Sequence, residues 1–226
     1  MKPLAWSYSS LEAFETCPHR YQQTKVLKTI VEPQTESMLW GNRVHKALEL
    51  RVGKGTPLSK ELIQYEPIAA SICRKRDIGA KIVCEQKLAL NKNFKVTTWF
   101  ASDVWVRGIT DVTIVKGDKA VILDHKTGKP KPGSGQLKLT AAITFATLPY
   151  INTITNSFLW LKSGTTTTET FQRDQAPEIW QEFMPRVQRM EEALKQDNWP
   201  KRPSGLCKSW CPVHTCEFNG RGSGGS

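Results

Sequence analysis

Features that would place this chain of 226 residues in several common classes are missing. It has no run of about 18 apolar residues, the length that a membrane-spanning helix needs, so we expect no membrane protein. The first ten residues, MKPLAWSYSS, hold one lysine and no long apolar segment, which argues against a secretory signal. A cytoplasmic protein of a prokaryotic cell, or a viral protein in a host cell, is therefore the expected setting.

Acidic residues are too few to balance the basic ones. The chain has 32 Lys and Arg against 21 Asp and Glu, and its net charge of +11 makes a polyanion the natural partner. Internal repeats and low-complexity segments are absent as well. The chain is 39% hydrophobic and has eight tryptophans, enough to bury a core. Charge alone leaves DNA, RNA and a membrane surface open as partners.

A disulfide framework is not expected, because the six cysteines belong to a chain without signs of secretion. Two of them, Cys73 and Cys84, stand alone and are interpreted as buried structural residues. The other four gather toward the chain ends: Cys17, Cys207, Cys211 and Cys216. The last three suit a soft metal, which needs a fourth ligand for tetrahedral closure. Either His214 or Cys17 could supply it, unless the thiols stay unligated.

Hydrophobic periodicity predicts helices near both chain ends and strands between them. The expected helices begin with one opened by a capping box at Ser9-x-x-Glu12, followed by segments at 38–51, 62–72, 135–150 and 176–196. The expected strands cover 81–90, 94–106, 109–115, 120–126, 153–161 and 165–171. We expect one α/β domain over 1–219, with a helical part at 8–77, a sheet core at 81–171 and a helix and cysteine segment at 176–219. Residues 220–226 are interpreted as a flexible tail or an appended linker.

Two carboxylates are expected to face each other in a hairpin. Asp111 and Asp124 lie thirteen residues apart, on strands joined by the turn at Gly117-Asp118. Cross-strand neighbours lie about 5 Å apart, close enough for both carboxylates to share Mg²⁺ or Mn²⁺. Lys126 shares a face with Asp124, since side chains two apart on a strand project to the same side. Such a set suits phosphodiester hydrolysis, although a surface hairpin with solvated charges has the same pattern.

Five patterns follow one another along the chain: YSSLEAFETCPHRY (8–21), GNRVHKALE (41–49), GITDV (108–112), ILDHKTGK (122–129) and GQLKLTAA (135–142). In this order they resemble the motifs of the RecB-like branch of the PD-(D/E)xK nucleases, which includes the CRISPR-associated adaptation exonucleases and the AddB nuclease domain. With the cysteine-rich end, the resemblance covers residues 8 to 216. It implies a restriction-endonuclease-like fold, a mixed central sheet flanked by helices, with the N- and C-terminal segments joined by a metal cluster.

The resemblance also implies roles for single residues. The implied ligands of Mg²⁺ or Mn²⁺ are His45, Asp111, Asp124 and the backbone carbonyl of His125, whose ring is expected on the opposite face. Lys126 is implied as the catalytic lysine, and Gln136 as the residue that positions it or the DNA backbone. Glu85 is an accessory candidate with either a catalytic or a structural role. Thr140 stands where the branch usually has an aromatic residue. The stacking or hydrogen-bonding role of that aromatic residue is therefore not expected in this chain.

For the cysteines at the two chain ends, the resemblance implies a 4Fe–4S cluster held by Cys17, Cys207, Cys211 and Cys216. Zinc is the alternative. The spacing Cys207-x3-Cys211-x4-Cys216 differs from the branch's x2 and x5 because the middle ligand is moved by one residue.

We therefore predict a metal-dependent DNA exonuclease that acts on single strands or frayed ends in recombination, repair or CRISPR-type processing. Lysines around the centre attract phosphates, and Tyr21, Trp40, Trp99 and Trp105 are candidates for stacking on unpaired bases, although core packing is the ordinary use of such residues. Two other interpretations stay open. One is a non-catalytic, zinc-containing nucleic-acid-binding module, and the other is an end-processing subunit that is active only with a helicase or integrase partner.

Overall fold

The structure, a computed structural model, describes residues 5–131 and 135–220. The tail predicted at 220–226 lies outside these residues except for Gly220. The chain divides into two compact units. Residues 36–181, with Ala5, form the first, which we call the sheet unit, and residues 6–35 with 182–220 form the second, the terminal unit.

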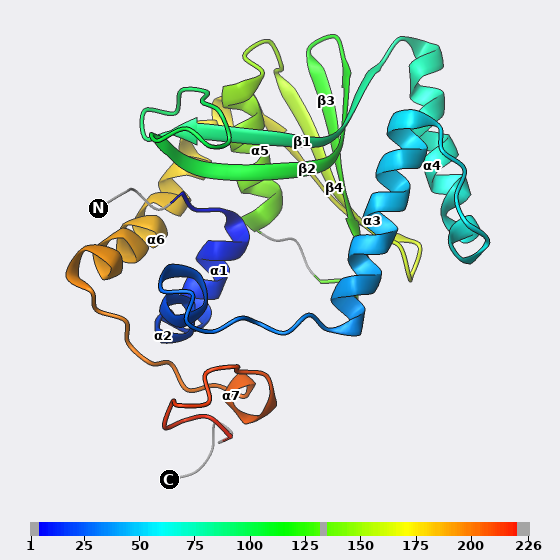
Figure 1. Cartoon of the computed structure of the whole chain (residues 1–226). Helices are drawn as coiled ribbons and strands as arrows, with labels where there is room; N and C mark the ends of the chain where they lie inside the picture. Colours follow the sequence, from blue (N-terminus) through cyan, green and yellow to red (C-terminus); the bar gives the residue numbers. More distant parts are fainter. Residues whose placement is uncertain (1–4, 132–134, 221–226) are drawn as a thin grey trace. The chain divides into compact units, whose positions relative to one another are not determined.

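A five-stranded sheet in the order β1-β2-β3-β4-β5 forms the centre of the sheet unit (Figure 1). β1 (Lys81–Asn91), β2 (Val104–Lys116) and β3 (Lys119–Lys126) pair antiparallel. β4 (Thr153–Trp160) runs parallel to β3, and β5 (Thr165–Gln172) pairs antiparallel with β4. Parallel neighbours need a crossover connection, and α5 (Gly135–Thr147) supplies it between β3 and β4. This mixed sheet with its helices confirms the predicted fold class.

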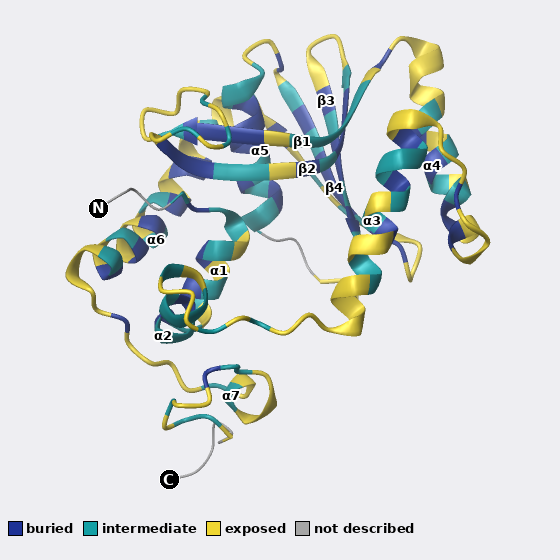
Figure 2. Ribbon diagram, viewed as in Figure 1, coloured by how far each residue is buried: buried dark blue, intermediate teal, exposed yellow. Residues whose placement is uncertain are grey.

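Helices cover the sheet by burying their apolar faces. From α3 (Glu36–Lys54) and α4 (Glu66–Cys73), side chains such as Val44 and Ile72 join strand residues such as Val112 in one core cluster. The 3-10 helices η2 (Lys60–Tyr65) and η3 (Arg74–Ile78) flank α4. Figure 2 shows burial concentrated in the strands and in the helix faces turned toward them. Within the described ranges, no helix is long and apolar enough to cross a membrane.

Of the two strands expected at 94–106 and 109–115, the second lies within β2, and the first is wrong over residues 94–103. Instead, β2 runs unbroken from Val104, and residues 92–103 form a loop apart from a bridge between Leu90 and Val96. Asn91 and Thr97 donate hydrogen bonds to the Asp103 carboxylate at 3.1 and 2.9 Å, which closes the loop. Gly108 does not end a strand, because it pairs with Leu88 within the continuous β1–β2 register.

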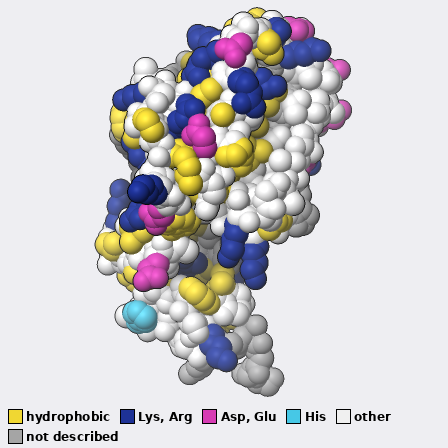
Figure 3. Space-filling model, turned by 90° about the vertical axis from the view of Figure 1, so that its right-hand side faces the viewer, with side chains coloured by type: hydrophobic (Ala, Val, Ile, Leu, Met, Phe, Trp, Pro, Cys, Tyr) yellow, Lys and Arg dark blue, Asp and Glu magenta, His cyan; other side chains and the backbone are white. Residues whose placement is uncertain are grey.

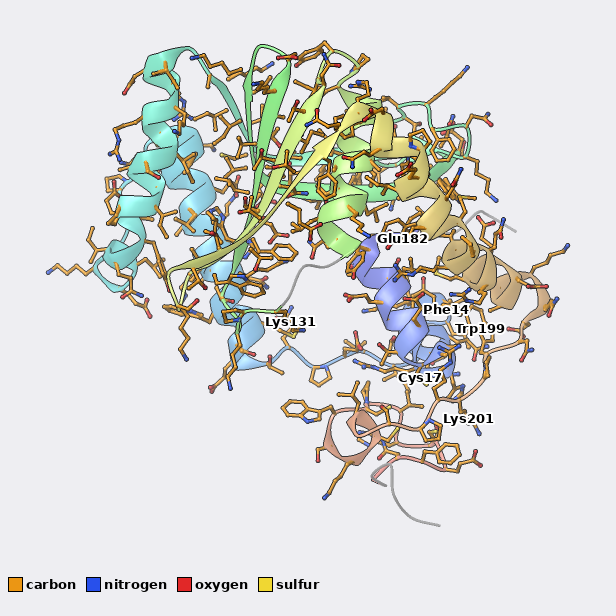
Figure 4. The ribbon with its side chains drawn as sticks, turned by 180° about the vertical axis from the view of Figure 1, so that it is seen from behind. Phe14, Cys17, Lys131, Glu182, Trp199 and Lys201 are labelled. Atoms are coloured by element: carbon orange, nitrogen blue, oxygen red, sulfur yellow. The ribbon has the colours of Figure 1, made fainter. Side chains whose placement is uncertain are left out.

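The terminal unit combines the two ends of the chain. Its elements are α1 (Tyr8–Thr16), α2 (Pro18–Tyr21), the π-helix η1 (Gln22–Val26), residues 182–196 of α6 (Ala176–Gln196) and α7 (Leu206–Ser209). Phe14 packs against Trp199 with ring centroids 6.3 Å apart, and Figure 4 labels both side chains. Arg186 donates two hydrogen bonds, of 2.8 and 2.7 Å, to the carboxylate of Glu15. Aromatic packing and an ion pair therefore join segments that lie far apart in the sequence.

The N-cap of the first helix lies two residues before the expected one. Ser7, in extended conformation, is the N-cap, and its Oγ accepts a hydrogen bond from the backbone N–H of Ser10. Ser10 Oγ in turn accepts from the backbone N–H of Ser7 at 2.8 Å. The capping box thus uses two serines in place of the expected Ser9 and Glu12, because a serine hydroxyl at the third helical position can also reach back to the cap.

Candidate active site

The β2–β3 hairpin brings Asp111 toward Asp124. The turn after Lys116 uses Gly117 with φ of 60°, and the ladder ends with Val112 opposite Leu123, one residue short of the two carboxylates. Past that pair, the backbone N–H of His125 donates to Asp111 Oδ2 at 2.7 Å. The strands therefore stop pairing where the candidate chemistry begins.

One set of ligand atoms is already gathered at this point. His45 on α3, Glu85 on β1 and Asp111 on β2 each offer a ligand atom, and these atoms lie within 4.8 Å of one another. Among the described residues, no other group of three His, Cys, Asp or Glu side chains meets this distance. All three line an open cleft of about 720 Å³. Carboxylate oxygens with one imidazole nitrogen suit a divalent cation such as Mn²⁺ or Mg²⁺.

α3 reaches this position because of a glycine. Gly41 lies one turn before His45, and a Cβ there would come within 3.3 Å of Thr127 Oγ1, just after β3. With a Cβ at this position, Thr127 Oγ1 would have to shift by a few tenths of an ångström, and glycine makes that shift unnecessary. His45 Nδ1 lies 3.2 Å from Asp111 Oδ2, so the close approach places the ring against the β2 carboxylate.

Lys126 belongs to a second group of hydrogen-bonded side chains. Lys126 Nζ lies 2.9 Å from the Asp124 carboxylate and donates to Gln136 Oε1 at 3.2 Å. Gln136 on α5 donates from Nε2 to Asp124 Oδ2 at 2.6 Å. The ammonium also lies 4.6 Å from the ring centroid of Phe158. Asp124 is therefore held by Lys126 and Gln136 and is not part of the group formed by His45, Glu85 and Asp111.

Glu85 occupies an unusual backbone position for a strand residue. Its φ is +50°, whereas its neighbours Cys84 and Gln86 pair regularly with Val112 and Thr110. A side-chain-bearing residue in this region stores on the order of 1–3 kcal/mol of strain, which persists mainly at functional sites. The sequence pattern left Glu85 between a catalytic and a structural role. The structure brings its carboxylate to His45 and Asp111.

The ring of His125 lies on the side of Asp111, not away from it as expected. Its Nδ1 is 3.5 Å from Asp111 Oδ2, and the ring meets that of His45 edge-on at 6.0 Å. β2 and β3 no longer pair at this point, although β3 still pairs with β4, with His125 opposite Leu159. The side chain is 2% exposed, and its Nε2 has no hydrogen-bond partner in the described residues. The role of its carbonyl as a ligand stays a prediction.

The electrostatics of the two groups differ. Burial raises the pKa of Asp111, but hydrogen bonds from His125 and His45 outweigh it and hold that pKa well below the ordinary value. The hydrogen bond to Asp111 raises the pKa of His45 despite its burial. Burial raises the pKa of Asp124, against the opposing charge of Lys126. Burial, with the charge of Asp111, also raises the pKa of Glu85. Close carboxylates that resist full ionisation favour neutralisation by a cation.

The four predicted cluster cysteines line one small cavity in the terminal unit. The cavity walls include Cys17, between α1 and α2, and the later residues Cys207, Cys211 and Cys216. His214, the other candidate for a fourth ligand, is exposed and does not line it. Asn219 Nδ2 donates to the Cys211 carbonyl at 2.9 Å, and the Ser204 backbone N–H approaches Cys207 Sγ at 3.5 Å. Geometry thus groups Cys17 with the three later cysteines.

The four aromatic candidates for base stacking differ in their exposure to solvent. Tyr21 and Trp105 are buried, at 2% and 3% exposure, so they serve in the core. Trp40 lines the cleft, and Trp99 is half-buried on the loop after β1. Only the last two can meet a ligand without unfolding part of the core.

A second large cavity, of about 510 Å³, lies elsewhere in the sheet unit. Its lining is mainly apolar, with Ile72, Ile114 and Leu159 among the walls, and it includes none of the predicted site residues. Figure 3 shows the face that carries α4, where hydrophobic side chains are interspersed with Lys and Arg. With no acid or histidine in its lining, this cavity is not the candidate active site.

Comparisons with known proteins identify the family of the chain. Residues 5–216 match the family model of the PD-(D/E)XK nuclease superfamily. No curated protein matches the chain. Among solved structures, the "Putative exonuclease" from Eubacterium rectale is 12% identical with a TM-score of 0.54, over 88% of this chain and 84% of that one. The structure of SSO0001 is 13% identical with a TM-score of 0.46, over 95% of this chain and 86% of that one.

Proposed function

Because the chain belongs to the PD-(D/E)XK nuclease superfamily, we propose that it is a divalent-metal-dependent deoxyribonuclease that degrades DNA from single-stranded or frayed ends. One observation carries the proposal. Lys126, Asp124 and Gln136 form a hydrogen-bonded group next to the gathered ligand atoms of His45, Glu85 and Asp111. A lysine held beside a cation site is an arrangement that suits phosphodiester hydrolysis, because both charges can stabilise the transition state.

The ligand atoms of the cleft fit a divalent ion. His45, Glu85 and Asp111 would hold Mg²⁺ or Mn²⁺. Asp124, which lies in the neighbouring group with Lys126 and Gln136, and the His125 carbonyl are further oxygen ligands that the sequence resemblance implies. The ion, when bound, supplies Lewis-acid stabilisation of the phosphate and lowers the pKa of water.

The chain's own residues do the positioning. Lys126 Nζ is directed by Asp124 and Gln136, so that its charge meets the negative charge that develops on the phosphate oxygens. Gln136 fixes both partners, because its amide contacts the lysine through Oε1 and the aspartate through Nε2. Catalytic assistance comes from Lys126, and Gln136 is a positioning residue.

For the terminal unit, the proposal includes a 4Fe–4S cluster on Cys17, Cys207, Cys211 and Cys216, with zinc as the alternative. Four thiolates around one cavity suit either group. Tetrahedral zinc, with Zn–S bonds of about 2.3 Å, needs sulfurs about 3.8 Å apart. In the described part of the chain, no three cysteine sulfurs lie within 4.8 Å of one another, so tetrahedral zinc would have to draw them closer together.

The restriction to DNA ends has weaker support than the hydrolytic chemistry. The structural neighbour from Eubacterium rectale is named as an exonuclease, and the net charge of +11 suits a polyanionic substrate. A helicase or integrase partner, and a setting in recombination, repair or CRISPR-type processing, stay predictions from the sequence resemblance.

End-labelled linear DNA, single- and double-stranded, tests the proposal against a circular control in Mg²⁺ or Mn²⁺. We expect loss of linear but not circular DNA, and a rate about 10²- to 10⁴-fold lower for Lys126→Ala with DNA binding retained. Lys129→Ala, an exposed lysine three residues on, is the matched control and should cleave normally. Unchanged cleavage by Lys126→Ala contradicts the mechanism, and equal loss of circular DNA contradicts the exonuclease assignment.

The cluster is tested separately on anaerobically purified protein. We expect a brown protein with iron and acid-labile sulfide bound. A colourless protein with one equivalent of zinc establishes the alternative.

A further inference from the structure

Two cations lie over the ring of an indole on the loop that follows β1. The guanidinium carbon of Arg107 lies 5.2 Å from the ring centroid of Trp99, and Lys87 Nζ lies 5.7 Å from it. In the ranges 5–131 and 135–220, neither cation has a carboxylate partner, whereas Arg20 and Arg51 each form an ion pair with a glutamate. Arg107 Nε is buried and has no hydrogen-bond acceptor among those residues. The two charges are therefore not neutralised by the protein around them.

These residues lie on the face of the sheet that also lines the cleft, next to the cleft wall. Ile109 lines the cleft together with Asp111, and Lys87 lies directly opposite Ile109 in the β1–β2 register. Arg107 comes two residues before Ile109 on the same strand and so projects to the same face. Asp111, Ile109 and Arg107 thus form a row on one face of the sheet, with Lys87 beside it. Trp99 contacts both cations and lies at the end of this row.

The composition of the row matches one class of ligand. Uncompensated cations attract phosphate groups, and an indole face stacks on any base without regard to sequence. Ile109, 44% exposed, adds an apolar surface between the cations and the carboxylates. Inside a duplex the base faces already stack on one another, so an unpaired nucleotide offers Trp99 a face that internal base pairs do not.

We propose that Trp99, Arg107 and Lys87 form a binding site for an unpaired nucleotide next to the scissile phosphodiester, so that the strand delivered to Asp111 is single-stranded. The inference rests on the proposed nuclease function and names the substrate class for the same cleft. It assigns a binding role to the 92–103 loop, which carries Trp99 across the β1–β2 pair.

A purely structural role makes a different prediction. If the cations only anchor the loop to the strands, replacing Trp99 lowers the melting temperature and leaves the preference between single and double strands unchanged. If the indole binds a base, the loss is confined to single-stranded ligand. The two roles are therefore separated by comparing two DNA ligands on each variant.

The binding experiment uses the full chain with Lys126→Ala, which prevents cleavage during the titration. Fluorescence anisotropy is measured with a labelled oligothymidylate and with a blunt hairpin duplex of the same charge. We expect Trp99→Ala to weaken single-strand binding about 5- to 150-fold and to leave duplex binding unchanged. Trp99→Phe, which keeps a stacking face, should retain most of the affinity. Tyr150→Ala, an exposed aromatic residue (54%) outside the cleft lining, is the matched control.

The cations are tested by the salt dependence of binding. Arg107→Gln and Lys87→Gln should each reduce the slope of log K against log salt by about 0.7 on the single strand. Lys119→Gln, beside the β2–β3 turn, is the control and should leave the slope unchanged. A structural anchor does not alter this slope.

The outcomes separate this inference from the proposed function. Equal weakening of single-strand and duplex binding by Trp99→Ala, or no weakening of either, overturns the nucleotide site. If Trp99→Ala fails to fold, Trp99→Phe and the Arg107→Gln slope decide instead. Cleavage by the chain with Lys126 intact is scored independently: its absence overturns the nuclease proposal, while the binding comparison still decides the role of Trp99.

Discussion

The candidate oxygen and nitrogen ligands of the sheet unit and the candidate sulfur ligands of the terminal unit are held in different ways. His45, Glu85 and Asp111 come from a helix and two strands, and His45 and Asp111 contact each other directly. The cysteines lie on backbone with little regular secondary structure. Cys17 lies between two short helices, and Cys207 lies in the four-residue α7. Helices this short have little stability of their own.

This difference indicates which of the two candidate sites would need a bound metal for its segment to fold. The sheet unit is held by strand pairing and a shared apolar core, so its carboxylates are in place before any ion arrives. The cysteine segment after Trp199 has few buried residues, so a bound cluster would supply much of its stability. Loss of metal should therefore abolish catalysis in the sheet unit and destabilise the cysteine segment of the terminal unit.

The largest expected effect is the loss of a cluster ligand. Cys211→Ser should release bound iron and expose the segment after 199 to proteases, because ligand binding at structural metal sites contributes on the order of 10 kcal/mol to folding. Iron content and limited proteolysis with mass spectrometry measure this. Cys73→Ser is the control, since Cys73 is half-buried in the sheet unit and does not line the cysteine cavity. An unchanged protease pattern would break the proposed contrast.

The second effect concerns a ligand that should not affect folding. Glu85→Gln removes a carboxylate charge from the cleft and should weaken Mn²⁺ binding at least about tenfold, the scale seen when groups supporting a metal site are lost. Calorimetric titration measures the affinity. The melting temperature in a chelator should not fall, because burial and the charge of Asp111 already disfavour the ionised Glu85. A large loss of stability would show that the sheet site, too, depends on this residue for folding.

A smaller effect tests the backbone strain at the same position. Since φ of Glu85 is +50°, Glu85→Gly should be about 1 kcal/mol more stable than Glu85→Ala, as glycine occupies that region without a Cβ clash. Urea unfolding in a chelator measures the difference. At the neighbouring Gln86, which is not among the positive-φ residues, alanine should instead be the more stable of the two. The same order at both positions would refute the strain.

The smallest effect is the pH dependence of the metal-free protein. The pKa of folded His45 is raised, mainly by its hydrogen bond to Asp111, above the ordinary value of about 6.5 in the unfolded chain. Its stabilising contribution is fully present below that unfolded pKa and is lost as pH rises through the folded one.

His45→Gln should therefore lower the melting temperature more at pH 6 than at pH 9. His214→Gln, at an exposed histidine with no carboxylate partner in the described residues, is the control. An equal loss for His45→Gln at both pH values would show that the pairing with Asp111 contributes nothing.

Local patterns predicted much of the fold and part of the site. The turn at Gly117 and the alternation on either side predict the hairpin that the register confirms, and with it the shared face of Asp124 and Lys126. The same reasoning fails at 94–103, where β-branched and aromatic residues suggest a strand. Hydrogen bonds to Asp103 and the packing of Phe94 against Trp180 at 4.7 Å hold that segment as a loop.

By itself, the sequence determined the spacing of the motifs, the helix that carries His45 and the strands that carry Asp111 and Asp124, because periodicity and turn residues act over a few positions. Only the tertiary structure decided that Glu85 meets His45 and Asp111, that the His125 ring faces Asp111, and that Cys17 lies with the later cysteines. A positive φ within a strand, the end of a ladder and the approach of residues about 190 positions apart depend on contacts between distant segments. Those contacts, not local preference, complete the site.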